Sequence, residues 1–275
     1  MANQNISAFS SEDIKFDHVH CSYAEYDFPS HSHDVCELLF LIKGDIHYMV
    51  EGKVYHLPQH SLVISRASAL HSIKSNAPTE YERFNILFDE KKIGNHFFEK
   101  IPQDIDVVNF YGNELVCSLF RKFDYYSENF KQDALKKLLM NLTEEILCNV
   151  LLSSQDAVQS NSNSSNPIVN QALHYIHKNI TQPLTIESLC QELYITKSHL
   201  HHLFINHLEI TPKKYILSRK LLLARRELRS GSKPTDVCVN YGFCDYSTFY
   251  RHYVQYFGHT PSQEIHTKID REIIS

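Results

Sequence analysis

Residues 241–261 read YGFCDYSTFYRHYVQYFGHTP, and this stretch decides the fold of the C-terminal half. Gly242 stands in a short turn, where a tight connection between two helices needs a positive φ or a close approach of the backbone. Asp245 is suited to cap a helix over residues 246–257. The side of this helix that we expect to be buried carries Phe249, Tyr253, Tyr256 and Phe257. The stretch therefore predicts a turn followed by one amphipathic helix, which ends at the sequence GHTP.

The same arrangement occurs earlier in this half. Helical patterns cover residues 186–193 and 197–208, and Thr196 is suited to cap the second of them. A longer helix over residues 213–229 then leads towards the stretch quoted above. Residues 167–275 are therefore predicted to form an all-α domain with two helix-turn-helix units joined by a long helix. This connection places two recognition helices about 34 Å apart, which is one turn of DNA.

Several motifs follow one another along this region. They are PLTIESL at residues 183–189, Leu200 and Phe204, Thr211-Pro212, RKLLLA at residues 219–224, and the stretch quoted first. Together they resemble the DNA-binding domain of AraC/XylS-type bacterial transcription regulators, over residues 170–265. The resemblance implies an activator whose partners are double-stranded DNA and RNA polymerase.

The sequence departs from the pattern of this family at three places. Ile205 and Val254 stand where a basic residue often follows the aromatic residue of each recognition helix. Cys190 replaces an alanine, and Glu264-Ile265 replaces a Tyr-Arg pair. Together these exchanges imply weaker contact with DNA phosphates and an intact fold.

The resemblance assigns DNA contacts to the polar positions of the recognition helices. Those that would face base edges are Ser198, His201 and His202 in the first helix and Tyr246, Ser247, Tyr250 and Arg251 in the second. Arg251 can bind guanine O6 and N7 with two donors, whereas His, Ser and Tyr offer single contacts. Lys197, Lys213 and Lys214 suit phosphates, which position a protein without specifying a sequence. The histidines have a plainer alternative, which is a solvated helix face or a chance metal site.

The chain divides at a polar segment. Residues 153–166 are rich in Ser and Asn and cannot bury enough apolar surface to offset the entropy of ordering. We therefore expect a sensor and dimerisation domain over residues 1–152, a flexible linker over 153–166 and a DNA-binding domain over 167–275. Residues 1–166 hold 14 Lys and Arg against 23 Asp and Glu, whereas the remainder holds 13 against 9. Only the basic half is expected to meet a polyanion.

Short apolar segments separated by turn signals fill the chain before about residue 90. Examples are CELLFLI at 36–42, IHYMV at 46–50, KVYHL at 53–57, SLVIS at 61–65 and RFNILF at 83–88. This spacing predicts a small antiparallel β-barrel or sandwich, here over about residues 16–110. Over about residues 113–152 the apolar period becomes helical. The fold class expected for the whole chain is two-domain α+β, with a cupin-like barrel and following helices before the all-α domain.

The two helices after the barrel have different apolar patterns. The first is expected to bury Leu115, Leu119 and Phe123 on one face. The second is apolar over a wide arc that consists of Leu135, Leu138, Leu139, Leu142, Ile146, Leu147 and Val150. Such an arc can pack on the barrel or form the interface of a homodimer, and the sequence leaves both open.

The strand region also contains HSHDVCE at residues 31–37, followed after six residues by Gly44. This resembles the first cupin motif, and His71 falls where the second motif supplies its histidine. His31 and His33 point to the same face of a strand, and Glu37 has an even offset from both. Imidazoles and a carboxylate inside a barrel suit a divalent metal such as Fe, Mn, Ni or Zn. The same residues could instead line a polar, sugar-sized pocket or have a structural role.

Composition and the lack of a visible targeting signal indicate the cellular compartment in which we expect the protein. The 275 residues contain no run of 18 apolar residues, so no membrane span is expected, and no secretion signal is visible at the N-terminus. Seven cysteines without a CxxC pair argue for a reducing environment. We therefore expect a cytoplasmic protein.

Three functions are compatible with these features, and the third is a regulator like the first whose cupin domain senses the metal itself. The first is a ligand-responsive, sequence-specific transcription regulator, for which the family resemblance favours a sugar as effector and an operon for carbohydrate transport or catabolism. The alternative is a metal-dependent cupin enzyme, an isomerase or dioxygenase, with the helical region as an accessory. A duplicated helix-turn-helix has no purpose in an enzyme, so the chain is not expected to be one.

Overall fold

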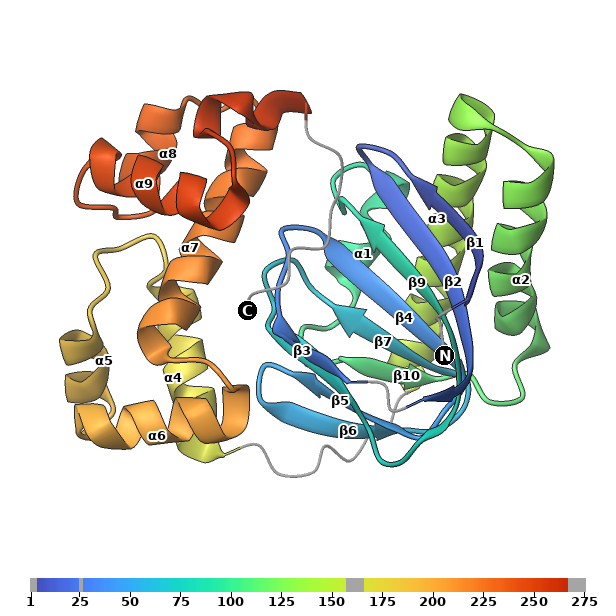
Figure 1. The fold of residues 1–275 in the computed structure, drawn as a ribbon, viewed down its shortest axis with the longest axis horizontal. Coiled ribbons are helices and arrows are strands. Elements are labelled where there is room, and N and C mark those ends of the chain that lie inside the picture. Colours follow the sequence, from blue (N-terminus) through green and yellow to red (C-terminus); the bar gives the residue numbers. More distant parts are fainter. Residues whose placement is uncertain (1–3, 25–26, 157–165, 267–275) are drawn as a thin grey trace.

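A computed structural model of the chain describes residues 4–24, 27–156 and 166–266. Within these ranges, ten strands form two antiparallel sheets that face each other (Figure 1). One sheet has the strand order β1-β2-β9-β4-β7-β10 and the other has the order β3-β8-β5-β6. The strands are β1 Gln4–Ser10, β2 Ile14–Ala24, β3 Phe28–His31, β4 Cys36–Lys43, β5 Ile46–Val50, β6 Lys53–Leu57, β7 Ser61–Ser65, β8 His71–Ser75, β9 Thr79–Phe88 and β10 Val107–Asn109.

Strand β4 is apolar along most of its length because both of its faces are covered. Leu38 and Phe40 pack with the helices outside the barrel, whereas Leu39 and Leu41 pack in the barrel interior. This alternation follows from the two-residue period of a strand. A strand that is buried on both faces is therefore expected to be a continuous apolar run, as residues 36–42 are.

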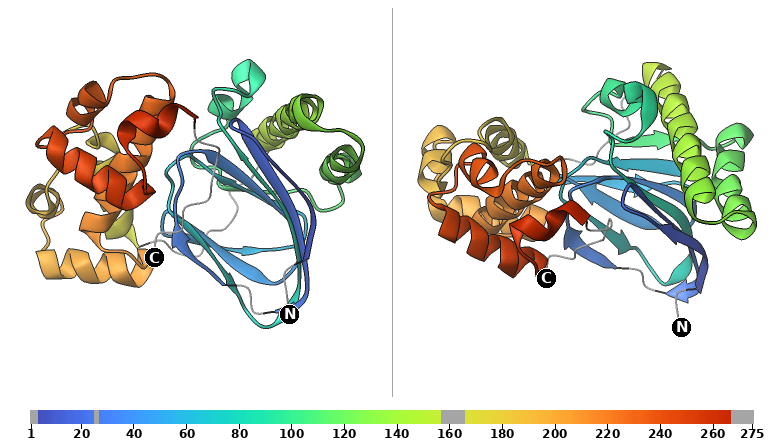
Figure 2. Two further views of the ribbon diagram at one scale, coloured as in Figure 1. Left: turned by 45° about the horizontal axis from the view of Figure 1, so that its top comes forward. Right: turned by 90° about the horizontal axis from the view of Figure 1, so that it is seen from above.

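Helices cover the outer face of the six-stranded sheet (Figures 1 and 2). They are η1 Gly94–His96, α1 Phe97–Lys100, α2 Glu114–Asn129 and α3 Gln132–Asp156. Most of the apolar arc on α3 is buried against the barrel and α2, which accounts for the wide stripe within one chain. The prediction for Leu115 is wrong, since this side chain is 58% exposed. The buried arc of α2 is centred on Val116, Phe120 and Phe123, and Leu115 lies about 110° away from it around the helix.

The C-terminal half is helical, and its long helix α7 runs between the two helix-turn-helix units (Figure 1). The elements are α4 Pro167–Lys178, α5 Ile186–Glu192, α6 Lys197–Leu208, α7 Pro212–Arg229, α8 Pro234–Asn240, α9 Tyr246–Phe257 and η2 Pro261–His266. The first unit has an apolar core that includes Leu189, Leu200 and Phe204 and extends to Met49 and Leu70 of the barrel half. The second has a separate core around Leu221 and Phe249. The predicted fold class, a β-barrel with following helices and an all-α domain, is confirmed.

Gly242 is the position in the second unit where only glycine fits. Its φ is +61°, and a Cβ atom there would lie 2.8 Å from the carbonyl carbon and oxygen of Gln182 in the first unit. Lys220 of α7 donates to the same carbonyl oxygen at 2.9 Å. The turn of the second unit is therefore seated directly on the backbone of the first unit.

Most of the predicted linker lies outside the described residues. Residues 153–156 continue α3, and Asn166 caps α4 by accepting from the backbone amides of Ile168 and Val169. In the described ranges, no helix is both long and apolar enough to cross a lipid bilayer.

Candidate functional site

The first recognition helix, α6, presents a polar face to solvent. Thr196 caps it by accepting from the amide of His199 at 3.2 Å. Leu200, Phe204 and Leu208 are buried, and this fixes the rotation of the helix about its axis. The residues left exposed on α6 include Ser198, His201 and His202, as expected from the sequence.

The second recognition helix, α9, is built in the same way. Asp245 caps it by accepting from the amide of Thr248 at 2.7 Å, and Phe249, Tyr253 and Phe257 are buried. The exposed side chains include Tyr246, Ser247, Tyr250 and Arg251. Lys197, Lys213 and Lys214 are also exposed, in the first turns of α6 and α7, and Lys197 forms an ion pair with Glu187. All ten residues predicted to meet DNA are therefore open to solvent.

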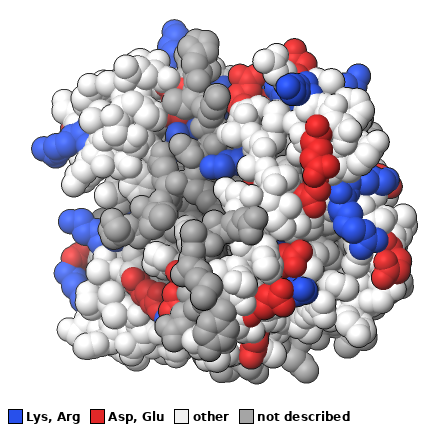
Figure 3. Space-filling view, turned by 45° about the vertical axis from the view of Figure 1, so that its right-hand side comes forward, with Lys and Arg blue, Asp and Glu red and all other residues white. Residues whose placement is uncertain are grey.

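The charge difference between the two halves also leads to ion pairs between them. Three arginines of α7 pair with carboxylates of the barrel half: Arg219 with Glu51, Arg226 with Glu90 and Arg229 with Asp34. Acidic and basic side chains are also interspersed on the face shown in Figure 3. Much of the positive charge of α7 is therefore neutralised by the barrel half and is not presented to a polyanion.

Inside the barrel, the structure brings His31, His33, Glu37 and His71 together. His31 and His71 are directly opposite each other on β3 and β8, Glu37 lies on β4, and His33 lies in the loop between β3 and β4. Each of the four residues is at most 3% exposed. Their ligand atoms all lie within 4.8 Å of one another.

The hydrogen bonds of this cluster favour a bound cation. The Nδ1 atoms of His31, His33 and His71 lie 2.9 to 3.0 Å from backbone carbonyl oxygens. Since a carbonyl only accepts, each Nδ1 must carry the proton, and a neutral ring then has a lone pair on Nε2. Two of these Nε2 atoms lie 2.7 and 3.0 Å from the same oxygen of Glu37. Lone pairs that face a buried carboxylate require a cation or an additional proton between them.

Burial keeps the third imidazole of the cluster, His31, in its neutral form. Desolvation, together with the charge of His71, lowers the pKa of His31 to about 2. Carbonyl acceptors on Nδ1 are also the outer-shell partners that orient imidazoles for metal binding. The cluster therefore fits a divalent transition metal, held by three Nε2 atoms and the carboxylate of Glu37.

The size of the cavity at the histidine cluster also favours a metal ion. The space bounded by His31, Glu37, Tyr48 and His71 measures about 10 Å³. This is close to the minimum needed for one water molecule and far too small for a sugar. The geometry at these four residues thus favours an ion over the sugar-sized pocket that the sequence also allowed.

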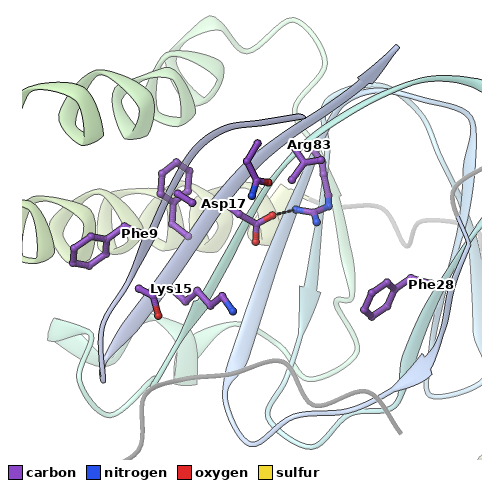
Figure 4. A pocket seen from close by; sticks show the side chains of 10 residues that line it. Phe9, Lys15, Asp17, Phe28 and Arg83 are labelled. Atoms are coloured by element: carbon purple, nitrogen blue, oxygen red, sulfur yellow. Dashed lines mark hydrogen bonds and ion pairs between the residues drawn. The ribbon is translucent and has the colours of Figure 1, made fainter. Parts of the chain in front are cut away.

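A larger hollow opens at the mouth of the barrel (Figure 4). Its volume is about 550 Å³, within the range of small-molecule sites. Lys15, Asp17 and Arg83 line it from the six-stranded sheet, and Phe28 faces them from β3. Asp17 and Arg83 form an ion pair of 2.5 Å. Arg83 and Phe28 also line the small cavity at the histidine cluster, so the two spaces adjoin.

Sequence reasoning missed this hollow and the polar residue next to it. Asn85 lies opposite Asp17 in the strand register, is fully buried, and has no hydrogen-bond partner for either amide atom among the described residues. A signal was present, because Lys15 and Asp17 alternate with apolar residues in β2, as Arg83 and Asn85 do in β9. Polar residues at every second position of a strand indicate a polar interior face.

Comparisons with known proteins agree with this geometry. The family model "AraC-like ligand binding domain" matches residues 14–96, and "Helix-turn-helix domain" matches residues 189–265. The Regulatory protein SoxS of Salmonella typhimurium is 32% identical over 104 residues, which are 38% of this chain and 97% of SoxS. The chain belongs to the AraC/XylS family.

Two further members of the AraC/XylS family match most of the chain. The Melibiose operon regulatory protein of Escherichia coli strain K12 is 23% identical over 257 residues, covering 85% of this chain and 82% of that protein. The XylDLEGF operon transcriptional activator 1 of Pseudomonas putida is 24% identical over 260 residues, covering 90% of this chain and 71% of that protein. These relatives are transcription regulators and not enzymes, so the cupin enzyme alternative is set aside.

Glu264, where the AraC/XylS pattern has a different residue, proves to be structural. It is fully buried and accepts from Arg225 at 2.6 Å, Arg229 at 3.0 Å and the hydroxyl of Tyr253 at 2.6 Å. The position therefore does not face DNA phosphates. The weaker phosphate contact inferred from the sequence does not arise from this exchange.

Proposed function

We propose that this protein is a ligand-responsive, sequence-specific DNA-binding activator of an operon for carbohydrate transport or catabolism. The observation that carries the proposal is the pair of helices α6 and α9, whose caps and buried faces leave polar side chains exposed on both. Ser198, His201, His202, Tyr246, Ser247, Tyr250 and Arg251 would contact bases, and Lys197, Lys213 and Lys214 would contact phosphates.

The effector is proposed to bind at the mouth of the barrel. A hollow of about 550 Å³ suits a sugar, and Lys15, Asp17 and Arg83 offer donors and acceptors for hydroxyl groups. Phe28 offers an apolar face to a sugar ring. The operon named for the E. coli relative, melibiose, supports a carbohydrate effector.

A second ligand is proposed for the buried cluster. His31, His33, Glu37 and His71 would hold a divalent metal ion, for the reasons of hydrogen bonding and size given above. The metal would tie three strands and one loop together next to the effector hollow. This position suits a structural or regulatory ion.

The partners follow from the proposed role. An activator acts on RNA polymerase at a promoter, and we propose the cytoplasm as the compartment because the proposed target is DNA. We also propose a homodimer, because α2 leaves large apolar side chains exposed. Leu115 and Tyr125 are 58% and 59% exposed on α2 and could contribute to an interface between copies.

A genome-wide map of DNA occupancy tests the regulator proposal. We expect discrete peaks upstream of a few operons for the wild type and much weaker peaks for Arg251→Ala, because this side chain is placed to read a base. Genes beneath the peaks would identify the chemistry of the effector. A flat map for a folded wild-type protein, with and without the sugars the organism uses, would contradict the proposal.

A cobalt titration of the purified full chain tests the metal site. We expect one equivalent of Co²⁺ to give a visible absorption band in the wild type. His33→Ala should weaken binding by more than the roughly 10- to 100-fold that loss of an outer-shell partner costs. The matched control is His56→Ala, which removes a histidine with a 55% exposed side chain and should leave the titration unchanged. Absence of a stoichiometric band in the wild type would refute the metal site.

A further inference from the structure

The two segments that carry the histidines of the cluster also form the contact with the helical half. Asp34 directly follows His33, and Leu70 directly precedes His71. Both neighbours are buried, with exposures of 3% and 1%. The buried cluster and the interface between the halves are therefore one residue apart along the chain at two places.

Asp34 contacts the second helix-turn-helix unit. Its Oδ2 accepts from Nη1 of Arg229 at 2.7 Å, and its Oδ1 lies 3.8 Å from Nη1 of Arg225. Both arginines also bind Glu264, which in turn binds Tyr253 of recognition helix α9. The loop that contains His33 is thus joined through buried ionic contacts to α9.

Ser68 links the same loop to the first half of α7. Its amide donates to the carbonyl of His33 at 2.7 Å, and its own carbonyl accepts from Arg219 at 3.0 Å. Ser68 has a φ of +64° and is 2% exposed. A non-glycine residue held in this region is strained, and strain of this kind tends to occur at switches and ligand clamps.

Glu51 anchors the segment before His71. It accepts from the amide of Leu70 at 2.8 Å, from the hydroxyl of Tyr215 at 2.6 Å and from Arg219 at 3.1 Å. Burial alone would raise the pKa of Glu51, but a hydrogen bond to His177 and the charge of Arg219 lower it to about 2. The carboxylate is therefore charged at neutral pH and holds the first half of α7.

These contacts act on both halves of one helix. Tyr215 and Arg219 lie towards the first unit, whereas Arg225 and Arg229 lie towards the second. The barrel thus supports α7 on either side of its middle while α6 and α9 remain exposed. Such support fixes how the two recognition helices are held relative to each other.

We infer that a metal ion in the cluster strengthens DNA binding by fixing the Asp34 and Ser68–Leu70 segments against α7. The inference rests on the proposed metal site and adds its regulation. Without a cation, the lone pairs of His33 and His71 facing Glu37 repel it, and the two segments lose their common anchor. With a cation, coordination holds them in the positions from which Asp34 and Ser68 bind the arginines of α7. Asp34 and Ser68 are then positioning residues.

The test measures affinity for an operator duplex by the full chain, with saturating Co²⁺ and with a chelator. For the wild type we expect Co²⁺ to raise the affinity by roughly 5- to 150-fold, the usual size of coupling between two sites. Asp34→Asn and Arg229→Gln should keep the cobalt band and lose this gain. The matched control is Lys74→Gln, which removes an exposed ion pair of 2.5 Å with Glu209 at the same interface and should keep the gain.

The outcomes separate the proposals from one another. A wild type without a stoichiometric cobalt band refutes the metal site, and a wild type without specific DNA binding refutes the regulator. If both ligands bind but Co²⁺ leaves the affinity unchanged or lowers it, the coupling is wrong and the other two proposals stand. If Asp34→Asn and Arg229→Gln both retain the full gain, the route through these residues is wrong. Melting curves establish that each variant is folded.

Discussion

Glu264→Gln is expected to destabilise the second helix-turn-helix unit by about 3–5 kcal/mol, the usual cost of removing one partner from a buried ion pair. The amide has nearly the same size but no charge, so Arg225 and Arg229 keep Asp34 as a carboxylate partner and lose the charge of Glu264. Arg225 is 2% exposed and cannot turn to water without moving α7. The hydroxyl of Tyr253 would also lose its charged acceptor.

Hydrogen exchange of the backbone amides in α9 measures this effect locally. A loss of about 3 kcal/mol corresponds to more than about 100-fold faster exchange in that helix. Glu187→Gln is the matched control, because it removes an exposed carboxylate that pairs with Lys197 on the first unit. Little change is expected there, since exposed ion pairs contribute little. If the amides of α9 exchanged at the same rate in the two variants, the buried ion pairs of Glu264 would not stabilise the second unit.

Arg251→Ala is expected to lower the affinity for a specific operator by about 1–3 kcal/mol, or roughly 5- to 150-fold. The guanidinium is exposed on α9, and its two donors match O6 and N7 of guanine. Loss of a base contact should weaken specific binding far more than binding to unrelated DNA. The discrimination between the two duplexes should therefore shrink by the same factor.

Titrations with operator and unrelated duplexes at several salt concentrations separate base from phosphate contacts. Lys213→Ala is the matched control, as a cation at the start of α7 that is proposed to bind phosphate. It should weaken both duplexes alike and reduce the slope of log affinity against log salt by about 1. If Arg251→Ala also weakened both duplexes equally, Arg251 would be a phosphate contact and not a base contact.

The helices of the C-terminal half follow from the sequence because their signals are local. Thr196 and Asp245 cap α6 and α9, and the expected bounds of both helices agree with the structure at each end. The strands of the barrel are also predictable from apolar runs and turns. At Glu51-Gly52 both φ values are positive, as a two-residue hairpin turn of type I′ requires.

What could not be predicted depends on contacts between distant segments. The sequence identifies His31, His33, Glu37 and His71 as a group through a motif, but the volume between them is set by packing. No local sequence pattern predicts the buried ion pairs of Asp34 and Glu264, because their arginine partners lie 195 and 39 residues away in the chain. From the basic charge of residues 167–275, the sequence predicts contact with DNA. It does not predict that three arginines of this half pair with carboxylates of the barrel half.

The contact between Gly242 and Gln182 has a consequence for promoters. A side chain at position 242 would collide with the backbone of the first unit, so the two units are already in contact at this turn and cannot be drawn closer together there. The distance between the paired half-sites in each operator must then match the protein. Substitutions of single base pairs can be tolerated one at a time, but an inserted base pair rotates one half-site relative to the other. Regulated promoters should therefore vary in sequence while keeping the same spacing.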